Sequence, residues 1–407
     1  MLATLIPLFD ENMSVSAYSL FSQRENFLKD PRYFVTAQLD GAGTIDGLEI
    51  INNNGLETLS SDNQIFVSLT NVSIFADVTS QCDVPHSKII FLLDRSIKPT
   101  DMYIARIYEL KAEGYHFAIR KLHSEDFDSY EPILKCIDYV FLNTQSEDFL
   151  DATSYFHNLY PEIKLIAGNI NTQDEYTKCT DMGGFELYEG PFYRVPITKG
   201  DTDVSPLKIN YIQLLNAVNI DDFDLQEAAD IIGRDTALVI SLLKIVNNMT
   251  ANAEITTIRH AAAMLGQKEL KKWITTAVAK QMCFDKPNEI MRLSLVRAKF
   301  AENLATNFGL AVKSQELFLM GLFSVLDLIL NKPMEEALTM LNISNDIKKA
   351  LIDNDGPLAD IYNFMQAYES ANWQEVSRII IVNKLNMAEI YNSYVDSLKW
   401  YTKLLQD

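Results

Sequence analysis

The chain changes character near Thr198, and this change constrains its fold more than any other feature of the sequence. Before this point, short apolar runs rich in β-branched and aromatic residues alternate with longer amphipathic stretches. After it, apolar residues recur at helical spacing with little interruption. The segment between the two parts is polar and contains a glycine and a proline. We therefore expect two domains, residues 1–198 and 207–407, joined by a linker at 199–206.

The first part contains about eight short runs with the composition of β-strands. Helical stretches of about 10–15 residues separate the later runs, and this alternation predicts βαβ units and a parallel sheet. Eight strands within about 200 residues suit a compact α/β barrel. The expected strands are Leu2–Phe9, Ser14–Leu20, Gln64–Leu69, Lys88–Leu93, His116–Ile119, Tyr139–Leu142, Lys164–Ala167 and Phe185–Tyr188.

The second part predicts a domain built only of helices. Leu238 and Leu242 fall on one face of a helix that Asp235 is suited to cap. Thr257 precedes a further apolar stretch in the same way, and Gly266 is suited to end it. The expected fold is therefore a TIM-like α/β barrel followed by an all-α domain.

The chain is strongly acidic, with 55 acidic and 35 basic residues and a formal net charge of −20. A protein of this charge repels phosphate backbones and anionic lipids, so we expect neither nucleic acid nor membrane surfaces as partners. Residues 1–200 carry 29 acidic and 15 basic side chains, which places 14 of the 20 excess negative charges in the first part.

Features that would direct the chain to a membrane or an oxidising compartment are weak. The longest apolar stretch, Leu317–Leu330, is interrupted by polar residues and is short for a spanning helix. The run Met1–Phe9 lacks the basic segment of a signal peptide. The four cysteines are widely spaced and suit the reduced thiols of a cytoplasmic protein: Cys82, Cys136, Cys179 and Cys283. Together these features lead us to expect a soluble, cytoplasmic protein.

Several segments resemble two families of bacterial signalling domains. The opening segment Pro7–Phe21 resembles the start of an EAL domain, the barrel of cyclic-di-GMP phosphodiesterases, and the likeness continues through Gly55–Leu59 and Gly183–Tyr193. The second part resembles an HDOD domain more specifically, through Asp224–Asp235 and Ile255–Gly266. Together the two resemblances cover nearly the whole chain and imply a reduced EAL-like barrel followed by an HDOD domain.

The EAL resemblance implies a set of catalytic positions, and most of them carry unsuitable residues here. EAL-type hydrolysis uses divalent cations held by carboxylates and an amide at the C-terminal ends of the barrel strands. The signature glutamate falls at Ser19, the substrate-contacting arginine at Gln23, the metal asparagine at Ser68, the next metal glutamate near Phe91, the paired aspartates at Arg120 and Lys121, the catalytic lysine at Phe141, the aspartate after it at Asn143, two later glutamates at Gly168 and Asn171, and the final glutamine at Glu189.

The residues at the predicted strand ends lead to the same expectation without the family. Asp94 and Glu189 are the carboxylates there, beside the cations Arg120 and Lys121. Two carboxylates next to two cations favour an ion-pair cluster over a metal cage, with Arg120 and Lys121 bound to Asp94 or nearby acids. We expect no phosphodiesterase activity, no metal and no cofactor. Whether Arg120 and Lys121 bind the phosphates of a nucleotide is left open.

The second part offers no hydrolase site either. HD hydrolases hold metal with histidines and an adjacent His-Asp pair, and the corresponding place here carries Ser324 and Val325. His260 is the single histidine of this part, and one histidine does not make a binuclear site. HDOD domains lack this chemistry as a class, so we expect a structural role for His260.

The sequence therefore predicts a scaffold rather than an enzyme. We expect a bacterial signalling protein that acts through protein–protein contacts in regulation of the cyclic-di-GMP or two-component type, a role that the resemblance implies. The alternative is a sensor that binds cyclic-di-GMP without hydrolysing it. The sequence leaves the identity of the protein partners, the regulated process and homo-oligomer formation open.

Overall fold

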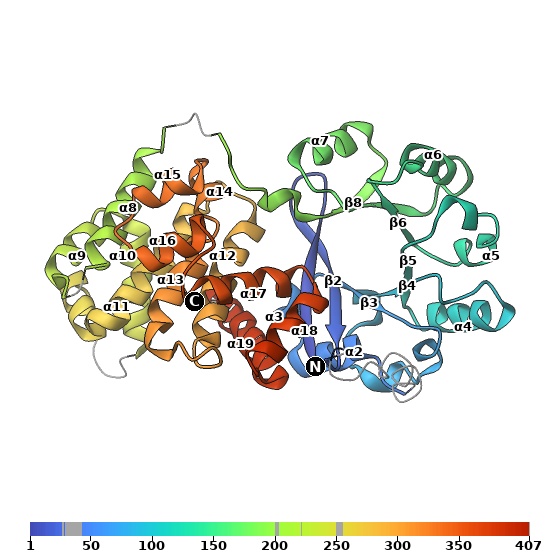
Figure 1. The fold of residues 1–407 in the computed structure, drawn as a ribbon, viewed down its shortest axis with the longest axis horizontal. Helices are drawn as coiled ribbons and strands as arrows, with labels where there is room; N and C mark the ends of the chain where they lie inside the picture. Colours follow the sequence, from blue (N-terminus) through green and yellow to red (C-terminus); the bar gives the residue numbers. More distant parts are fainter. Residues whose placement is uncertain (27, 29–42, 200–202, 221, 250–254, 407) are drawn as a thin grey trace. The chain divides into compact units, whose positions relative to one another are not determined.

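A computed structural model describes residues 1–26, 28, 43–199, 203–220, 222–249 and 255–406, and the chain forms two compact units (Figure 1). The first unit comprises Met1–Val195 and Phe364–Thr402, and the second comprises Pro196–Asn363 and Lys403–Asp407. Residues 200–202 of the expected linker 199–206 lie outside the described residues. The units differ from the expected domains, because part of the C-terminal region groups with the barrel.

Eight strands close into a barrel in chain order, as the sequence predicts. Their lengths suit a small barrel whose interior is filled by side chains. The strands are β1 (Leu2–Phe9), β2 (Val15–Gln23), β3 (Gln64–Ser68), β4 (Ile89–Leu93), β5 (His116–Ile119), β6 (Tyr139–Asn143), β7 (Lys164–Gly168) and β8 (Phe185–Glu189).

The expectation of a purely parallel sheet is wrong for one strand. β1 pairs antiparallel with both β2 and β8, whereas the pairs from β2 to β8 are parallel. A short turn joins β1 to β2, and a parallel connection would need a crossover of about a dozen residues. Asp10 shapes this turn, because its Oδ1 accepts the backbone N–H groups of Asn12 and Ser14 at 2.8 and 2.9 Å.

Helices between the strands surround the barrel, and alternate strand residues fill its interior. The helices are α2 (Asp46–Asn54), α3 (Leu56–Ser60), α4 (Asp101–Ala112), α5 (Glu131–Leu134), α6 (Phe149–Leu159) and α7 (Gln173–Met182). The same alternation continues from this interior to Ser19, Arg120 and Glu189 near the strand ends. The interior residues are Leu8, Ala17, Phe66, Ile90, Leu92, Ala118, Tyr139, Phe141, Ile166 and Leu187.

The C-terminal helices supply much of the remaining packing of the first unit. They are α17 (Ala359–Glu369), α18 (Trp373–Val382) and α19 (Met387–Gln406), and residues 364–402 belong to this unit. The Ala3 N–H group at the start of β1 donates to Tyr368 Oη at 3.3 Å. Asn54 Nδ2 in α2 donates to Tyr391 Oη at 3.1 Å. These contacts explain why a helical segment distant in sequence groups with the barrel.

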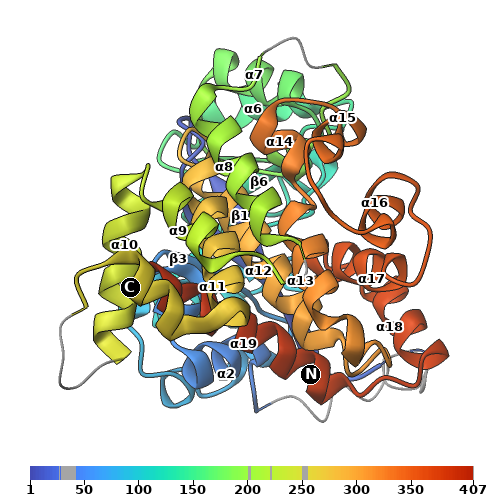
Figure 2. The ribbon, with the colours of Figure 1, turned by 90° about the vertical axis from the view of Figure 1, so that its left-hand side faces the viewer.

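The second unit is helical, as predicted, and Figure 2 labels its helices from α8 to α16. The Thr257 hydroxyl caps α11 by accepting the His260 N–H group, and Gly266 interrupts that helix with a φ of 70°. No helix among the described residues is both long and apolar enough to cross a membrane. Its helices are α8 (Pro206–Val218), α9 (Leu225–Ile232), α10 (Thr236–Met249), α11 (Ile258–Met282), α12 (Asn288–Leu304), α13 (Ser314–Phe323), α14 (Leu326–Leu330), α15 (Met334–Thr339) and α16 (Asn345–Ile352).

Asp327 makes the stability of the second unit depend on pH. Its side chain is buried, and its Oδ2 accepts the Ile197 N–H group at 3.1 Å. Burial raises the pKa of this carboxyl above its ordinary value of 3.8, although backbone N–H donors and Arg297 oppose the rise. The folded state therefore holds the proton more tightly than the unfolded state, so the stability that Asp327 contributes is present at low pH and is lost as pH rises through the folded pKa.

We expect an Asp327→Asn variant to gain unfolding free energy relative to the parent as pH rises from about 4 to about 7. Asparagine keeps an oxygen that can accept the Ile197 N–H group but carries no charge. Urea unfolding at several pH values, with hydrogen exchange of α14 as the local probe, measures this difference. A difference that stays constant over the range would contradict the assignment.

Candidate functional site

The barrel interior, at the C-terminal ends of the parallel strands, brings together three residues at predicted catalytic positions. Ser19 lies in β2, Arg120 directly follows β5, and Glu189 ends β8. All three continue the inward-facing series of their strands, so their side chains reach the barrel axis from different sides. The side chains of Arg120 and Glu189 retain only 18% and 11% of their exposure.

The three side chains bind one another. Arg120 Nη2 donates to Glu189 Oε2 at 2.7 Å, which makes a short, charge-assisted hydrogen bond. Ser19 Oγ donates to the same carboxylate oxygen at 3.0 Å, and Arg120 Nη2 also lies 3.3 Å from Ser19 Oγ. Ser19 Oγ, Arg120 Nη2 and Glu189 Oε2 therefore form one connected hydrogen-bonded group.

Aromatic rings enclose the guanidinium group of Arg120. Its Cζ lies 4.0 Å from the centroid of the Phe141 ring and 5.4 Å from that of Phe21. A cation over an aromatic face gains electrostatic stabilisation, more so where water is excluded. Phe141, at the position of the family's catalytic lysine, thus supports a cation supplied by another strand. Within the described residues, Arg120 Nε is buried without a hydrogen-bond partner.

Phe91 and Asp94, two other predicted positions, make their contacts outside this cluster. Ser68 is exposed at the end of β3. Phe91 packs against Tyr115 and Phe117, with ring centroids 4.9 and 5.7 Å away, rather than among the interior residues. The Asp94 carboxylate accepts the Ser96 N–H group, and the ion pair found for Arg120 is with Glu189 rather than with Asp94.

A cavity of about 320 Å³ opens beside the cluster at the ends of β5 to β8. Lys121 and Gly168 line it, as do Arg120 and Glu189. Asn169, a residue without a predicted role, also lines it, together with His123. Their place within a few residues of a strand end was the available signal, because barrel sites form from these loops.

Two exposed asparagines make part of the cavity lining polar. Asn169 Nδ2 donates to Asn143 Oδ1 at 2.9 Å, and both residues directly follow buried strand residues. Asn169 has a φ of 62°, a left-handed conformation that asparagine tolerates better than most side chains. The cavity therefore combines cations, amides and aromatic rings in one concave surface.

The mouth residues do not fit a catalytic metal ion. A hard divalent cation needs several oxygen ligands, yet Glu189 is the one carboxylate in the cluster and already binds Arg120. Across the parts of the chain that the structure describes, no three histidine, cysteine, aspartate or glutamate side chains gather as a metal site. The Arg120 guanidinium group supplies the positive charge beside Glu189 that a metal ion would otherwise supply.

The place of a His-Asp pair in the second unit is occupied by hydrogen bonds between Arg297, Ser324 and the Gly321 carbonyl oxygen. Arg297 Nη1 donates to Ser324 Oγ at 3.1 Å, and Ser324 is buried. Gly321 lets α13 approach α12 closely, because an added Cβ would lie 2.4 Å from the Arg297 carbonyl oxygen. His260 is exposed early in α11, and its backbone N–H group joins the helix cap.

Comparison with known proteins identifies the helical part. The HDOD domain family matches this chain over residues 205–354. This range begins at the residue that caps α8 and includes α16. The family match therefore covers most of the second unit.

Two proteins and several solved structures are similar to this chain, and the EAL domain of a mycobacterial protein is one of these structures. The Vibrio cholerae protein named cyclic di-GMP phosphodiesterase CdgJ is 26% identical over 325 residues, covering 78% of this chain and 74% of that protein. The Bacillus subtilis protein YuxH is 26% identical over 413 residues, covering 98% of this chain and 97% of that protein. The EAL domain of Mycobacterium smegmatis DcpA shares 11% identity, with a TM-score of 0.35, over 46% of this chain and 89% of that structure.

Proposed function

Because this chain is an EAL-HDOD protein, we propose that it acts in cyclic-di-GMP-related signalling without hydrolysing the nucleotide, through contacts with partner proteins. The observation that supports the proposal is the bond between Arg120 and Glu189 at the barrel mouth. A metal ion would have to displace a buried guanidinium group to reach this carboxylate, with no second carboxylate in the cluster to assist it.

The name of the Vibrio cholerae relative indicates the alternative to this proposal, which is hydrolysis of cyclic-di-GMP. That protein is named a phosphodiesterase, and it is 26% identical to this chain. At such a distance the fold can persist while the residues of a site change. The purified chain, incubated with cyclic-di-GMP and Mg²⁺ or Mn²⁺, should leave the nucleotide intact, and turnover by the protein itself would overturn the proposal.

The cavity beside the cluster favours a second candidate, a sensor that binds cyclic-di-GMP without cleaving it. Lys121 and His123 could bind phosphate oxygens there, and the aromatic lining could stack on a base. Isothermal calorimetry separates the two functions, because a scaffold acting only through proteins should give no heat with the nucleotide. Heat that disappears in a Lys121→Glu variant would favour the sensor.

A further inference from the structure

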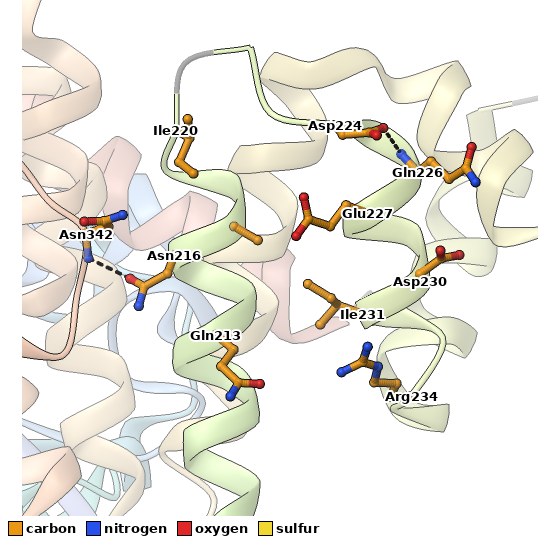
Figure 3. A pocket seen from close by; sticks show the side chains of 11 residues that line it. Gln213, Asn216, Ile220, Asp224, Gln226, Glu227, Asp230, Ile231, Arg234 and Asn342 are labelled. Atoms are coloured by element: carbon orange, nitrogen blue, oxygen red, sulfur yellow. Dashed lines mark hydrogen bonds between the residues drawn. The ribbon is translucent and has the colours of Figure 1, made fainter.

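An open groove lies between α8 and α9 of the second unit, and neither the barrel site nor the family resemblance assigns it a role (Figure 3). Its volume is about 740 Å³. Gln213, Asn216, Ala217 and Ile220 line it from α8 and the turn that follows. Asp224, Glu227, Ile231 and Arg234 lie among its residues on the α9 side.

The α9 wall carries two opposite charges with an apolar residue between them. Glu227 and Ile231 project from α9 toward α8, and Arg234 projects the same way from the turn that follows α9 (Figure 3). Glu227 and Arg234 are seven residues apart in the sequence, with Glu227 in the first turn of α9 and Arg234 two residues beyond its end at Ile232. They lie too far apart in the sequence to pair as neighbours on one helix.

These two side chains differ from the neighbouring charges Asp224 and Asp230, which form bonds with other described residues. Asp224 caps the helix by accepting the Gln226 N–H group at 2.7 Å, and Asp230 pairs with Arg259 at 3.1 Å. Among the described residues, the side chains of Glu227 and Arg234 have no hydrogen-bond or ion-pair partner. Their charges are therefore available to a molecule that enters the groove.

The α8 wall is fixed in place. Asn216 Nδ2 donates to the Met340 carbonyl oxygen at 2.8 Å, and Asn216 Oδ1 accepts the Asn342 N–H group at 2.6 Å. Ile220 is 54% exposed at the end of this wall and offers apolar surface. A rigid wall reduces the ordering needed on binding, which favours a groove that is used as it stands.

We propose that this groove binds an amphipathic helix of a partner protein that carries one cation and one anion seven positions apart, with an apolar residue between them. The cation meets Glu227, the anion meets Arg234, and the apolar residue packs on Ile231 and Ala217. A different protein is the expected occupant rather than a second copy, because two copies with a net charge of −20 each repel one another. The inference rests on the proposed role in protein–protein signalling and names its binding surface.

The test selects binding sequences and asks whether the two charges dictate them. A phage library of randomised helical peptides of about 16 residues is selected against the full-length parent and against the variants Glu227→Lys and Arg234→Glu. The parent should select one cation and one anion seven positions apart. Glu227→Lys should select two anions at this spacing, and Arg234→Glu should select two cations. Peptides from the parent selection should bind each variant about tenfold more weakly or worse.

Several outcomes would overturn this inference. Selected peptides that bind the parent and both variants equally would show that the groove charges do not determine binding, and a selection without binders would show that the groove does not take helices. Self-association of the parent that is lost in both variants would identify a second copy as the occupant. Circular dichroism of each variant, matched to the parent, confirms folding. The peptide-binding test and the hydrolysis test have separate outcomes. The groove can fail to bind peptides in a protein that does not hydrolyse cyclic-di-GMP, and a protein that hydrolyses the nucleotide can still bind peptides in the groove.

Discussion

Replacing Arg120 by methionine should lower the unfolding free energy of the barrel unit by about 2–4 kcal/mol, because it leaves the Glu189 carboxylate charged and without its cation in a nearly buried place. The variant also lacks the contact that the Arg120 guanidinium group makes with the Phe141 ring in the parent. Hydrogen exchange of the β5 and β8 amides reports this loss within the unit, whatever the helical unit does.

Two companion variants show whether the pairing itself carries the effect. In the double variant Arg120→Met with Glu189→Gln, most of the stability should return, because no charge remains unpaired. Lys164→Met is the matched control, since Lys164 pairs with Glu186 between β7 and β8 and both side chains are about half exposed. The control should change the unfolding free energy by less than about 1 kcal/mol. Equal losses in Arg120→Met and Lys164→Met would contradict the special role of the buried pair.

Replacing Tyr368 by alanine should destabilise the barrel unit by about 3–5 kcal/mol, the range expected when a buried aromatic side chain is removed. Tyr368 is fully buried, and its ring contacts those of Trp373 and Tyr394 at centroid distances of 5.5 and 5.1 Å. Its hydroxyl also accepts the Ala3 N–H group of β1. The variant therefore opens a cavity and weakens the link between α17 and the barrel.

Hydrogen exchange should locate this effect in β1 and β2 as well as in α17 to α19. Tyr108→Ala is a suitable control, because Tyr108 belongs to the same unit but is 54% exposed, and it should have little effect. Loss of protection in α8 to α16, with β1 and β2 unchanged, would contradict the grouping of residues 364–402 with the barrel.

The barrel could be predicted from the sequence because each strand is a local pattern. Short β-rich runs separated by helical stretches locate all eight strands without knowledge of their neighbours. The reversed direction of β1 was also within reach, because the turn after Phe9 is too short for a parallel crossover. That step required attention to connection length rather than to periodicity.

The partner of the C-terminal helices could not be predicted in the same way. The pattern of α19 shows that one face is buried, but an apolar face fits any core that offers apolar surface. The contact between Asn54 and Tyr391 joins residues 337 positions apart, and no local rule addresses such a pair. The helical pattern alone therefore extended the second domain to residue 407.

The candidate site was predicted as an ion-pair cluster, but the sequence did not determine which carboxylate binds Arg120. The strand-end argument selected Arg120, Asp94 and Glu189 together, because all three follow or end strands. The choice of Glu189 over Asp94 as the partner of Arg120 depends on the register and stagger of the closed barrel, which the sequence does not specify. The support from Phe141 depends on the same register.

The central claim is that this barrel does not hydrolyse cyclic-di-GMP, and the most direct measurement follows the nucleotide itself. Purified full-length protein is incubated with cyclic-di-GMP and Mg²⁺ or Mn²⁺, and liquid chromatography quantifies the linear dinucleotide. We predict no product above the protein-free control, while an active EAL phosphodiesterase converts the nucleotide under the same conditions. Product that increases with protein concentration would contradict the account.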